Sequence, residues 1–254
     1  MTFVFDLDGT IIFRGKPMCA DIAEALARLE ARGHEVVFAS ARPIRDMLPV
    51  LDERFHRRLL IGGNGSLVAR DGRVLHAETF EAEPLSRLLQ AVADSGCTYL
   101  IDGEWDYAYT GRADHPILNN LDPHKLAKNV PVEQLEPIVK ICLLSVEKET
   151  ELRARLAELD VVIHEHRNED ILDINPPGIH KWSALQKSGI AAGRFVAFGN
   201  DANDISMFRH ARHAVMVGYH PDLAPYAGES IPSGDERETV AAIVEKLSEL
   251  GRRL

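Results

Sequence analysis

The sequence is poor in cysteine and has no long apolar run. Its three cysteines, Cys19, Cys97 and Cys142, are scattered without the spacing of a metal site, so we expect free thiols in a reducing cytoplasm. No apolar stretch approaches the ~20 residues that a membrane-spanning helix needs, so we expect no membrane anchor. A strand pattern begins almost at the first residue, so we expect no signal peptide.

Positive charge is also scarce. Lys and Arg together number 29 against 39 for Asp and Glu, which leaves a formal net charge of −10. This balance argues against nucleic acid or an anionic membrane surface as a partner. It leaves an anionic small molecule open as a substrate, because a few local cations and a metal can override the distant field.

The first carboxylates follow directly on a buried strand. The segment Val4-Phe5-Asp6-Leu7-Asp8-Gly9-Thr10 is an apolar run that ends in two aspartates, a glycine and a hydroxyl. Strand residues two apart point to the same side, so Asp6 and Asp8 should project together. Two such carboxylates repel each other, and a bound Mg²⁺ is the usual relief because it favours hard oxygen ligands. The alternative is an ordinary strand end in a polar turn.

The order of predicted strands and helices along the chain indicates its domain organisation. Before the Gly62–Gly65 segment, strands and helices alternate with short connections, which favours a parallel sheet. We expect the strands Thr2–Leu7, His34–Ser40 and Arg58–Ile61, the helices Ala20–Arg32 and Pro43–Phe55, and a hairpin with arms Leu67–Arg70 and Arg73–Ala77. Pro49 should kink or split the second helix. Residues 79–176 have an antiparallel α+β pattern, with a strand Ile138–Val146 among others, and the alternation resumes at 177. The fold class is therefore α/β, with residues 1–78 and 177–254 in one domain and 79–176 inserted.

Polar residues follow three of the predicted parallel strands. Asp6 and Asp8 follow the first, Ser40 and Arg42 follow the second, and residues 199–204, Gly-Asn-Asp-Ala-Asn-Asp, follow a later one. Open parallel sheets bind ligands at this edge. Lys181, at the start of a predicted helix, would suit a phosphate contact. Taken singly, Ser40 could be a helix cap, Lys181 a surface lysine and residues 200–201 a loop, but in this order they support one another.

In this arrangement the chain resembles the haloacid dehalogenase (HAD) superfamily, and within it the Cof-type sugar-phosphate phosphatases of subfamily IIB. Residues 6–10, Asp-Leu-Asp-Gly-Thr, match the first motif, and residues 39–42, Ala-Ser-Ala-Arg, are similar to the second, Ala-Thr-Gly-Arg. Lys181 matches the third, and residues 199–204 resemble the fourth, Gly-Asp-x-x-Asn-Asp. The resemblance implies a Rossmann-like core with a C2-type cap.

The same resemblance implies a role for each matched residue. Asp6 would be the nucleophile and Asp8 the general acid and base. Ser40, Lys181 and Asn203 would bind phosphate, and Arg42 and Asn64 would face the substrate. Mg²⁺ would lie among Asp6, Asp8, Asn200, Asp201 and Asp204. Asn200 departs from the family pattern, which places an aspartate there, and Asp201 next to it is the alternative ligand.

The sequence thus predicts a Mg²⁺-dependent cytoplasmic phosphatase acting on a small phosphorylated metabolite, such as a sugar phosphate. A phosphotransferase or mutase with the same intermediate and a non-catalytic sensing module are the alternatives. We expect Gly62–Gly65 and Asn175–Gly178 to join the cap to the core as hinges. Trp105, Tyr107 and Tyr109 alternate on a cap strand, either as one packed face or as a sugar-stacking platform.

Overall fold

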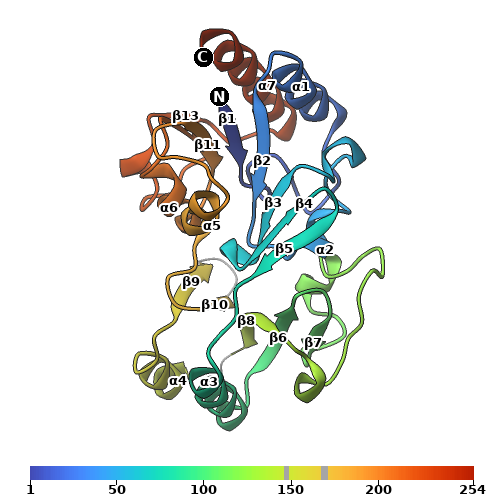
Figure 1. The fold of residues 1–254 in the computed structure, drawn as a ribbon, viewed down its shortest axis with the longest axis vertical. Helices are drawn as coiled ribbons and strands as arrows, with labels where there is room; N and C mark the ends of the chain where they lie inside the picture. Colours follow the sequence, from blue (N-terminus) through green and yellow to red (C-terminus); the bar gives the residue numbers. More distant parts are fainter. Residues whose placement is uncertain (146–148, 167–170) are drawn as a thin grey trace.

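The structure is a computed structural model that describes residues 1–145, 149–166 and 171–254, and it contains two separate sheets (Figure 1). The first has eight strands in the order β13-β12-β11-β1-β2-β3-β4-β5, and the second has five in the order β7-β6-β8-β10-β9. In the first sheet they are β1 (Thr2–Phe5), β2 (Glu35–Ala39), β3 (Leu59–Gly62), β4 (Leu67–Arg70), β5 (Arg73–Ala77), β11 (Phe195–Gly199), β12 (His213–Val217) and β13 (Glu229–Ile231). In the second they are β6 (Thr98–Gly103), β7 (Tyr107–Tyr109), β8 (Ile138–Ser145), β9 (Val162–His166) and β10 (Ile171–Asn175).

Helices cover both faces of the first sheet. The α-helices are α1 (Ala20–Ala31), α2 (Ile44–Met47), α3 (Ala82–Ser95), α4 (Glu149–Leu156), α5 (Lys181–Lys187), α6 (Ile205–Phe208) and α7 (Glu236–Arg253). Phe3 and Phe5 pack toward α1 and α7, whereas Val4 between them packs toward α5 and α6. A strand buried on both faces needs a continuous apolar run, which explains the pattern of residues 3–5.

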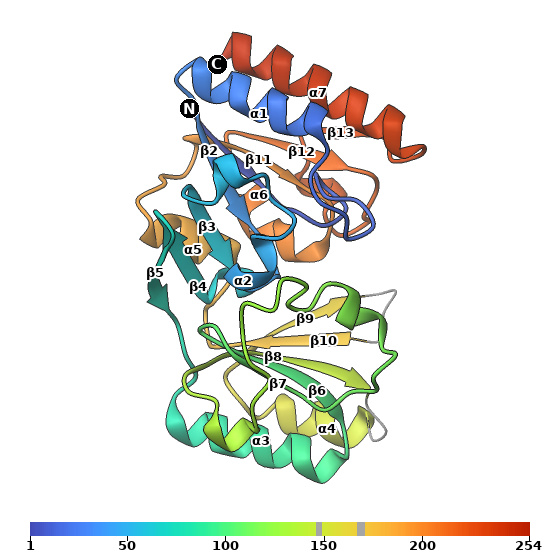
Figure 2. The same ribbon diagram turned by 90° about the vertical axis from the view of Figure 1, so that its right-hand side faces the viewer.

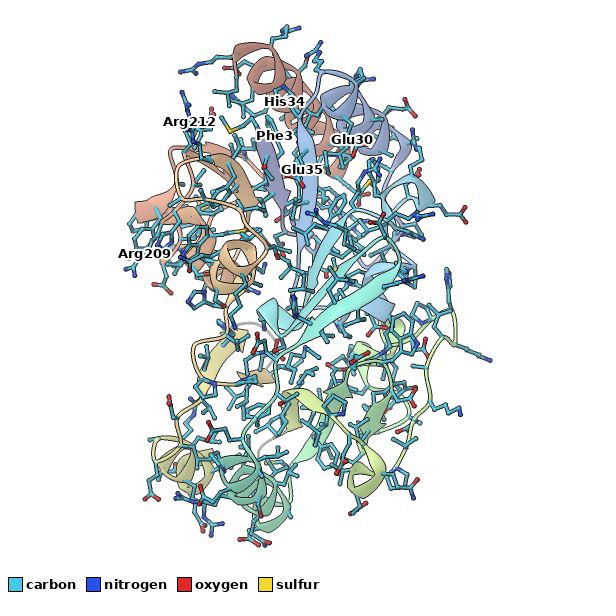
Figure 3. The ribbon with its side chains drawn as sticks, in the orientation of Figure 1. Phe3, Glu30, His34, Glu35, Arg209 and Arg212 are labelled. Atoms are coloured by element: carbon cyan, nitrogen blue, oxygen red, sulfur yellow. The ribbon has the colours of Figure 1, made fainter. Side chains whose placement is uncertain are left out.

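The second sheet has helices on one face only. Figure 2 shows α3 and α4 on the side away from the first sheet. Ile101 and Ile141 pack toward these helices, while Leu100 and Cys142, one residue along each strand, belong to a cluster on the opposite face. That opposite face turns toward the first sheet, so its side chains meet those at the end of the parallel strands. The labelled Phe3, His34 and Glu35 mark the other end of the first sheet, away from the second sheet (Figure 3).

The fold class is as the sequence predicted, α/β with a parallel sheet and an inserted α+β segment, and the hairpin arms match β4 and β5. This hairpin adds two antiparallel strands to the six parallel ones. The predicted helix Pro43–Phe55 is split at Pro49, as expected, because α2 ends at Met47 and a 3-10 turn, Glu53–Phe55, follows. Pro49 has no N–H to donate and its ring obstructs a continuous helix. Val146, which the pattern assigned to a strand, lies outside the described residues.

The chain passes between the sheets at two places. It leaves the first sheet after β5 and enters α3 at Ala82, and it returns after β10 toward α5. The expectation that Gly62–Gly65 joins cap and core was therefore wrong, since this segment connects β3 and β4 within the first sheet. Over the described residues, no helix is long and apolar enough to cross a membrane.

Candidate active site

Asp6 is the first residue after β1, at the carboxyl end of a central strand. Its N–H donates to the carbonyl of Phe198 on β11 at 2.9 Å, so the backbone is held by the neighbouring strand. Its side chain is 7% exposed. Lys181 Nζ donates to Oδ1 at 2.7 Å and the Thr10 hydroxyl donates to Oδ2 at 2.9 Å. Asp6 is therefore a buried carboxylate with both oxygens oriented.

Gly9 allows the turn after Asp8 to approach the loop that follows β11. Its φ of +77° lies in the left-handed region, and a Cβ there would be 2.2 Å from the Asn200 side-chain nitrogen. The Thr10 hydroxyl, one residue later, lies 3.2 Å from Asn200 Oδ1. The first and fourth motifs, far apart in sequence, are thus in direct contact.

Lys181 connects the same two loops through hydrogen bonds. Its side chain is fully buried, and Nζ donates to Asp204 Oδ1 at 2.6 Å as well as to Asp6. Asp204 Oδ2 accepts the N–H groups of Asn200 and Asp201 at 2.8 and 3.1 Å. Burial lowers the pKa of Lys181, but Asp204 and Asp6 outweigh it and the pKa lies above its usual value. Asp204 is therefore placed to hold the loop and the lysine.

The electrostatics of Asp6 reflect its burial. Desolvation raises the pKa of the Asp6 carboxyl to about 7, since the attraction of Lys181 does not fully offset it and the negative charge of Asp204 raises it further. A second cation near Asp6 would favour its ionised form.

Asp8 pairs with Arg42. Arg42 Nε and Nη2 donate to the two oxygens of Asp8 at 2.6 and 2.7 Å, which is a bidentate pair. The Arg42 side chain is 8% exposed and that of Asp8 48%. The N–H of Arg42 also donates to the hydroxyl of Ser40 at 3.1 Å. The loop after β2 therefore positions both the Ser40 hydroxyl and the Arg42 guanidinium.

Asn203 and Asn64 form a chain of side-chain hydrogen bonds. Asn203 Nδ2 donates to Asn64 Oδ1 at 3.1 Å, and Asn64 Nδ2 donates to Asp173 and Asn175 of β10 at 3.2 Å. Asn64 is fully buried and has a φ of 59°. It lies behind Asn203, which differs from the substrate-facing position that the sequence predicted.

A cavity of about 490 Å³ lies between the two sheets. Its core side includes Asp6, Asp8, Ser40, Arg42, Asn200, Asp201 and Asn203, and its cap side includes Leu100, Asp102, Lys140, Cys142, Ile171 and Asp173. These seven core residues were all predicted for the site, and the same side is also lined by Gly9, Ile12, Arg14, Gly15, Ala41, Pro43 and Asp46. The other three predicted residues do not line the cavity but contact residues that do. Lys181 donates to Asp6, Asn64 accepts from Asn203, and Asp204 accepts from the backbone of Asn200 and Asp201.

The sequence analysis missed the charged residues of the cap side. Asp102, Lys140 and Asp173 each interrupt an apolar strand, and a buried charge in such a run is a signal that could have found them. Trp105 and Tyr107 do not line the cavity. The Trp105 indole donates to the Leu126 carbonyl at 2.7 Å, and the Tyr107 ring lies 4.9 Å from the Arg45 guanidinium. β7 begins at Tyr107, so Trp105 is not on the strand with it.

The oxygen atoms near Asp6 fit Mg²⁺ in kind. Thr10 contacts both Asp6 Oδ2 and Asn200 Oδ1, so a carboxylate and an amide oxygen converge there. Within the described part of the chain, no three Asp, Glu, His or Cys side chains group as a metal site. A magnesium site here would combine the Asp6 carboxylate with the Asn200 amide oxygen and backbone oxygen. Asp201 Oδ1 accepts from Ala202 N and lies 3.2 Å from His220 Nε2.

Comparisons with known proteins agree with this geometry. The model of the haloacid dehalogenase-like hydrolase family matches residues 3–242. The HMP-PP phosphatase of Cronobacter sakazakii is 29% identical over 231 residues, which cover 84% of this chain and 82% of that protein. The HMP-PP phosphatase of Citrobacter koseri is 26% identical over 235 residues, with the same two coverages of 84% and 82%. The structure of the HAD subclass IIB sugar phosphatase BT4131 superposes with a TM-score of 0.80 at 18% identity, covering 98% of both chains.

The fold and the strand-end carboxylates define a capped hydrolase of the HAD type. The chain belongs to the haloacid dehalogenase-like hydrolase family and is of its Cof type. It is a phosphatase, an enzyme that hydrolyses phosphoric monoesters.

Proposed function

We propose that the protein is a Mg²⁺-dependent phosphatase that hydrolyses a small phosphorylated metabolite through an aspartyl-phosphate on Asp6. The observation that carries this proposal is the buried Asp6 carboxylate, oriented by Lys181 and Thr10 at the edge of the cavity. Residues 1–78 and 177–254 would be the catalytic domain and residues 79–176 the cap.

In the first step a carboxylate oxygen of Asp6 attacks phosphorus, and the bond from phosphorus to the leaving oxygen breaks. Asp8 gives a proton to the leaving oxygen. Because Arg42 holds Asp8 through two hydrogen bonds, at least one of these must be exchanged for the leaving group. In the second step Asp8 takes a proton from water, which attacks phosphorus and releases Asp6.

The phosphoryl oxygens would be bound by Ser40, Lys181 and Asn203. The Asn203 amide nitrogen carries two protons and donates one of them to Asn64 at 3.1 Å, so the other can bind a phosphoryl oxygen. Asp6, the Asp8 carbonyl, Asn200 and Asp201 would hold Mg²⁺, with Asp204 fixing their loop. The ion supplies positive charge to the phosphoryl oxygens during transfer.

The substrate is proposed to be a sugar phosphate or another metabolite of that size. A cavity of about 490 Å³ suits such a molecule. The two relatives are named for HMP-PP and the structural neighbour for sugar phosphates, and both kinds of compound belong in a first substrate panel. We propose a cytoplasmic location from the low cysteine content.

A phosphate-release screen tests the proposal directly. The panel holds sugar phosphates, HMP-PP and p-nitrophenyl phosphate, each with Mg²⁺ and with EDTA. We expect release that needs Mg²⁺ and only water as acceptor. Release that is unchanged by EDTA would refute the metal dependence. Transfer to an added sugar at the expense of free phosphate would indicate the phosphotransferase alternative.

A further inference from the structure

Three charged side chains project from adjacent strands of the second sheet into the cavity. Asp102 is on β6, Lys140 on β8 and Asp173 on β10, and we call them the cap triad. β8 pairs with both other strands, and Asp102 lies directly opposite Lys140 in the register. All three line the cavity, and none is more than 6% exposed.

The triad places one buried ammonium between two carboxylates. Lys140 Nζ lies 3.6 Å from Asp102 Oδ2 and 3.6 Å from Asp173 Oδ1. Burial lowers the pKa of Lys140, but attraction to Asp173 and Asp102 outweighs it, and the pKa lies above its usual value. The lysine therefore stays charged although it is buried.

The ammonium donates its direct hydrogen bond to the core. Nζ lies 3.1 Å from the carbonyl oxygen of Ala41. Ala41 stands between Ser40, the predicted phosphate ligand, and Arg42, which holds Asp8. A cap side chain thus fixes the middle of the loop that positions both groups.

The other two members of the triad reach the core as well. Asp173 Oδ2 accepts from Asn64, which in turn accepts from Asn203 on the fourth-motif loop. Asp102 Oδ1 accepts from Arg45 of α2 at 2.5 Å. The triad therefore contacts the Ser40–Arg42 loop directly through Lys140 and the fourth-motif loop indirectly through Asp173 and Asn64.

We propose that Lys140 is a positioning residue for phosphoryl transfer: when the cap covers the cavity, its hydrogen bond to Ala41 sets the Ser40–Arg42 loop, and Asp102 and Asp173 direct the ammonium there. The inference rests on the proposed function. It assigns the cap a part in phosphate binding itself, in addition to any part in selecting the leaving group.

The test replaces Lys140 with methionine, which keeps the length and removes the donor. Three quantities are compared with wild type: kcat/KM on the best panel substrate, kcat/KM on p-nitrophenyl phosphate, and the affinity for inorganic phosphate by calorimetry. A misplaced loop should lower both kcat/KM values by about 10- to 100-fold, and phosphate should bind several-fold more weakly. A loss of folded protein alone would lower kcat and leave KM and phosphate affinity unchanged.

Two further variants separate the donor from the charge. Asp102→Asn combined with Lys140→Met restores the net charge of the triad, and it also serves if the single variant does not fold. Recovery of activity in this double variant would attribute the loss to uncompensated carboxylates and overturn the proposal. Lys187→Met removes a surface lysine paired with Glu78 and should leave all three quantities unchanged.

Other results would also refute the inference. Wild-type values for a folded Lys140→Met protein would do so, as would a loss confined to the larger substrate, which would indicate selectivity alone. If the wild type itself releases no phosphate, the proposed function fails, and the calorimetric comparison with inorganic phosphate still decides whether Lys140 shapes the site.

Discussion

The Lys181 ammonium nitrogen lies 2.7 Å from Oδ1 of Asp6, although the two residues are 175 positions apart in the chain. Lys181 begins α5, the helix that follows the cap, and Asp6 directly follows β1, the first strand. Their contact joins the two core segments that lie before and after the insertion, and it completes the phosphoryl site. The protein can therefore complete this site only after both core segments have come together.

Asp6→Asn should abolish turnover and leave the fold intact. Asparagine keeps the size, its oxygen can still accept from Lys181, and its amide nitrogen can donate to the Thr10 hydroxyl oxygen, but the amide cannot form the acyl phosphate. We expect a loss of roughly 10³-fold or more in phosphate release. Thermal unfolding should show one cooperative transition near the wild-type temperature.

The matched control for this change is Asp21→Asn, which neutralises an exposed aspartate in the first turn of α1. It should turn over like wild type. Turnover by Asp6→Asn close to the rate of this control would rule out a covalent role for Asp6.

Asp8→Asn should affect poor leaving groups more than good ones. A sugar alkoxide needs a proton as it departs, so its release should slow by about 10²–10⁴-fold. Nitrophenolate is stable as an anion, so its release should slow less. Rapid-mixing measurement of the first turnover separates this step from hydrolysis of the intermediate. Equal slowing for both leaving groups would remove Asp8 from the acid role.

Gly9→Ala should weaken the magnesium site. The added Cβ would meet Asn200, and the left-handed backbone would cost about 1–2 kcal/mol besides. We expect a higher Mg²⁺ concentration for half-maximal activity, measured by titrating the metal at saturating substrate. Gly72→Ala is the matched control, because Gly72 also has a left-handed φ, +75°, but a Cβ there would meet nothing within 4 Å. If both variants respond alike to Mg²⁺, contact with Asn200 is not the cause.

Stability should fall in mild acid through His180, which caps α5. Its Nδ1 accepts from the N–H of Ser183 at 3.0 Å, and the protonated ring could not accept there. Burial, with repulsion from His210, lowers the pKa of His180 below 6.5. The unfolded chain therefore binds the proton more readily, so this contribution is present above pH 6.5 and is lost as the pH falls through the lowered pKa.

His180→Asn tests this by replacing the ring with a side chain that can cap without titrating. The free energy of unfolding, measured by urea denaturation from pH 7.5 to 5, should fall less steeply than in wild type. His124→Asn changes an exposed histidine and serves as the control. A slope equal to that of wild type would show that the N-terminal capping of α5 does not respond to protonation of His180.

Much of the site was predictable because its residues directly follow strands, and each strand is recognised from a local pattern of the sequence. The alternation of apolar strands and amphipathic helices predicts a parallel sheet, and parallel strands bring their carboxyl ends to one edge. The sequence therefore predicts a common edge of the sheet for Asp6, Asp8, Ser40 and residues 199–204, before any contact between distant segments is known. The hairpin at Asp71 and Gly72 was equally local.

The cap triad, in contrast, depends on pairings that no local pattern encodes. Asp102, Lys140 and Asp173 meet because β8 pairs with both β6 and β10, and a shift of one residue in either register would turn a side chain to the helical face. The buried side chain of Asn64 likewise depends on distant partners, Asp173, Asn175 and Asn203. The sequence by itself determined which residues end the parallel strands, since that follows from periodicity. Only the tertiary structure decided which cap residues oppose them, because strand pairing and burial are set by contacts between segments far apart in the chain.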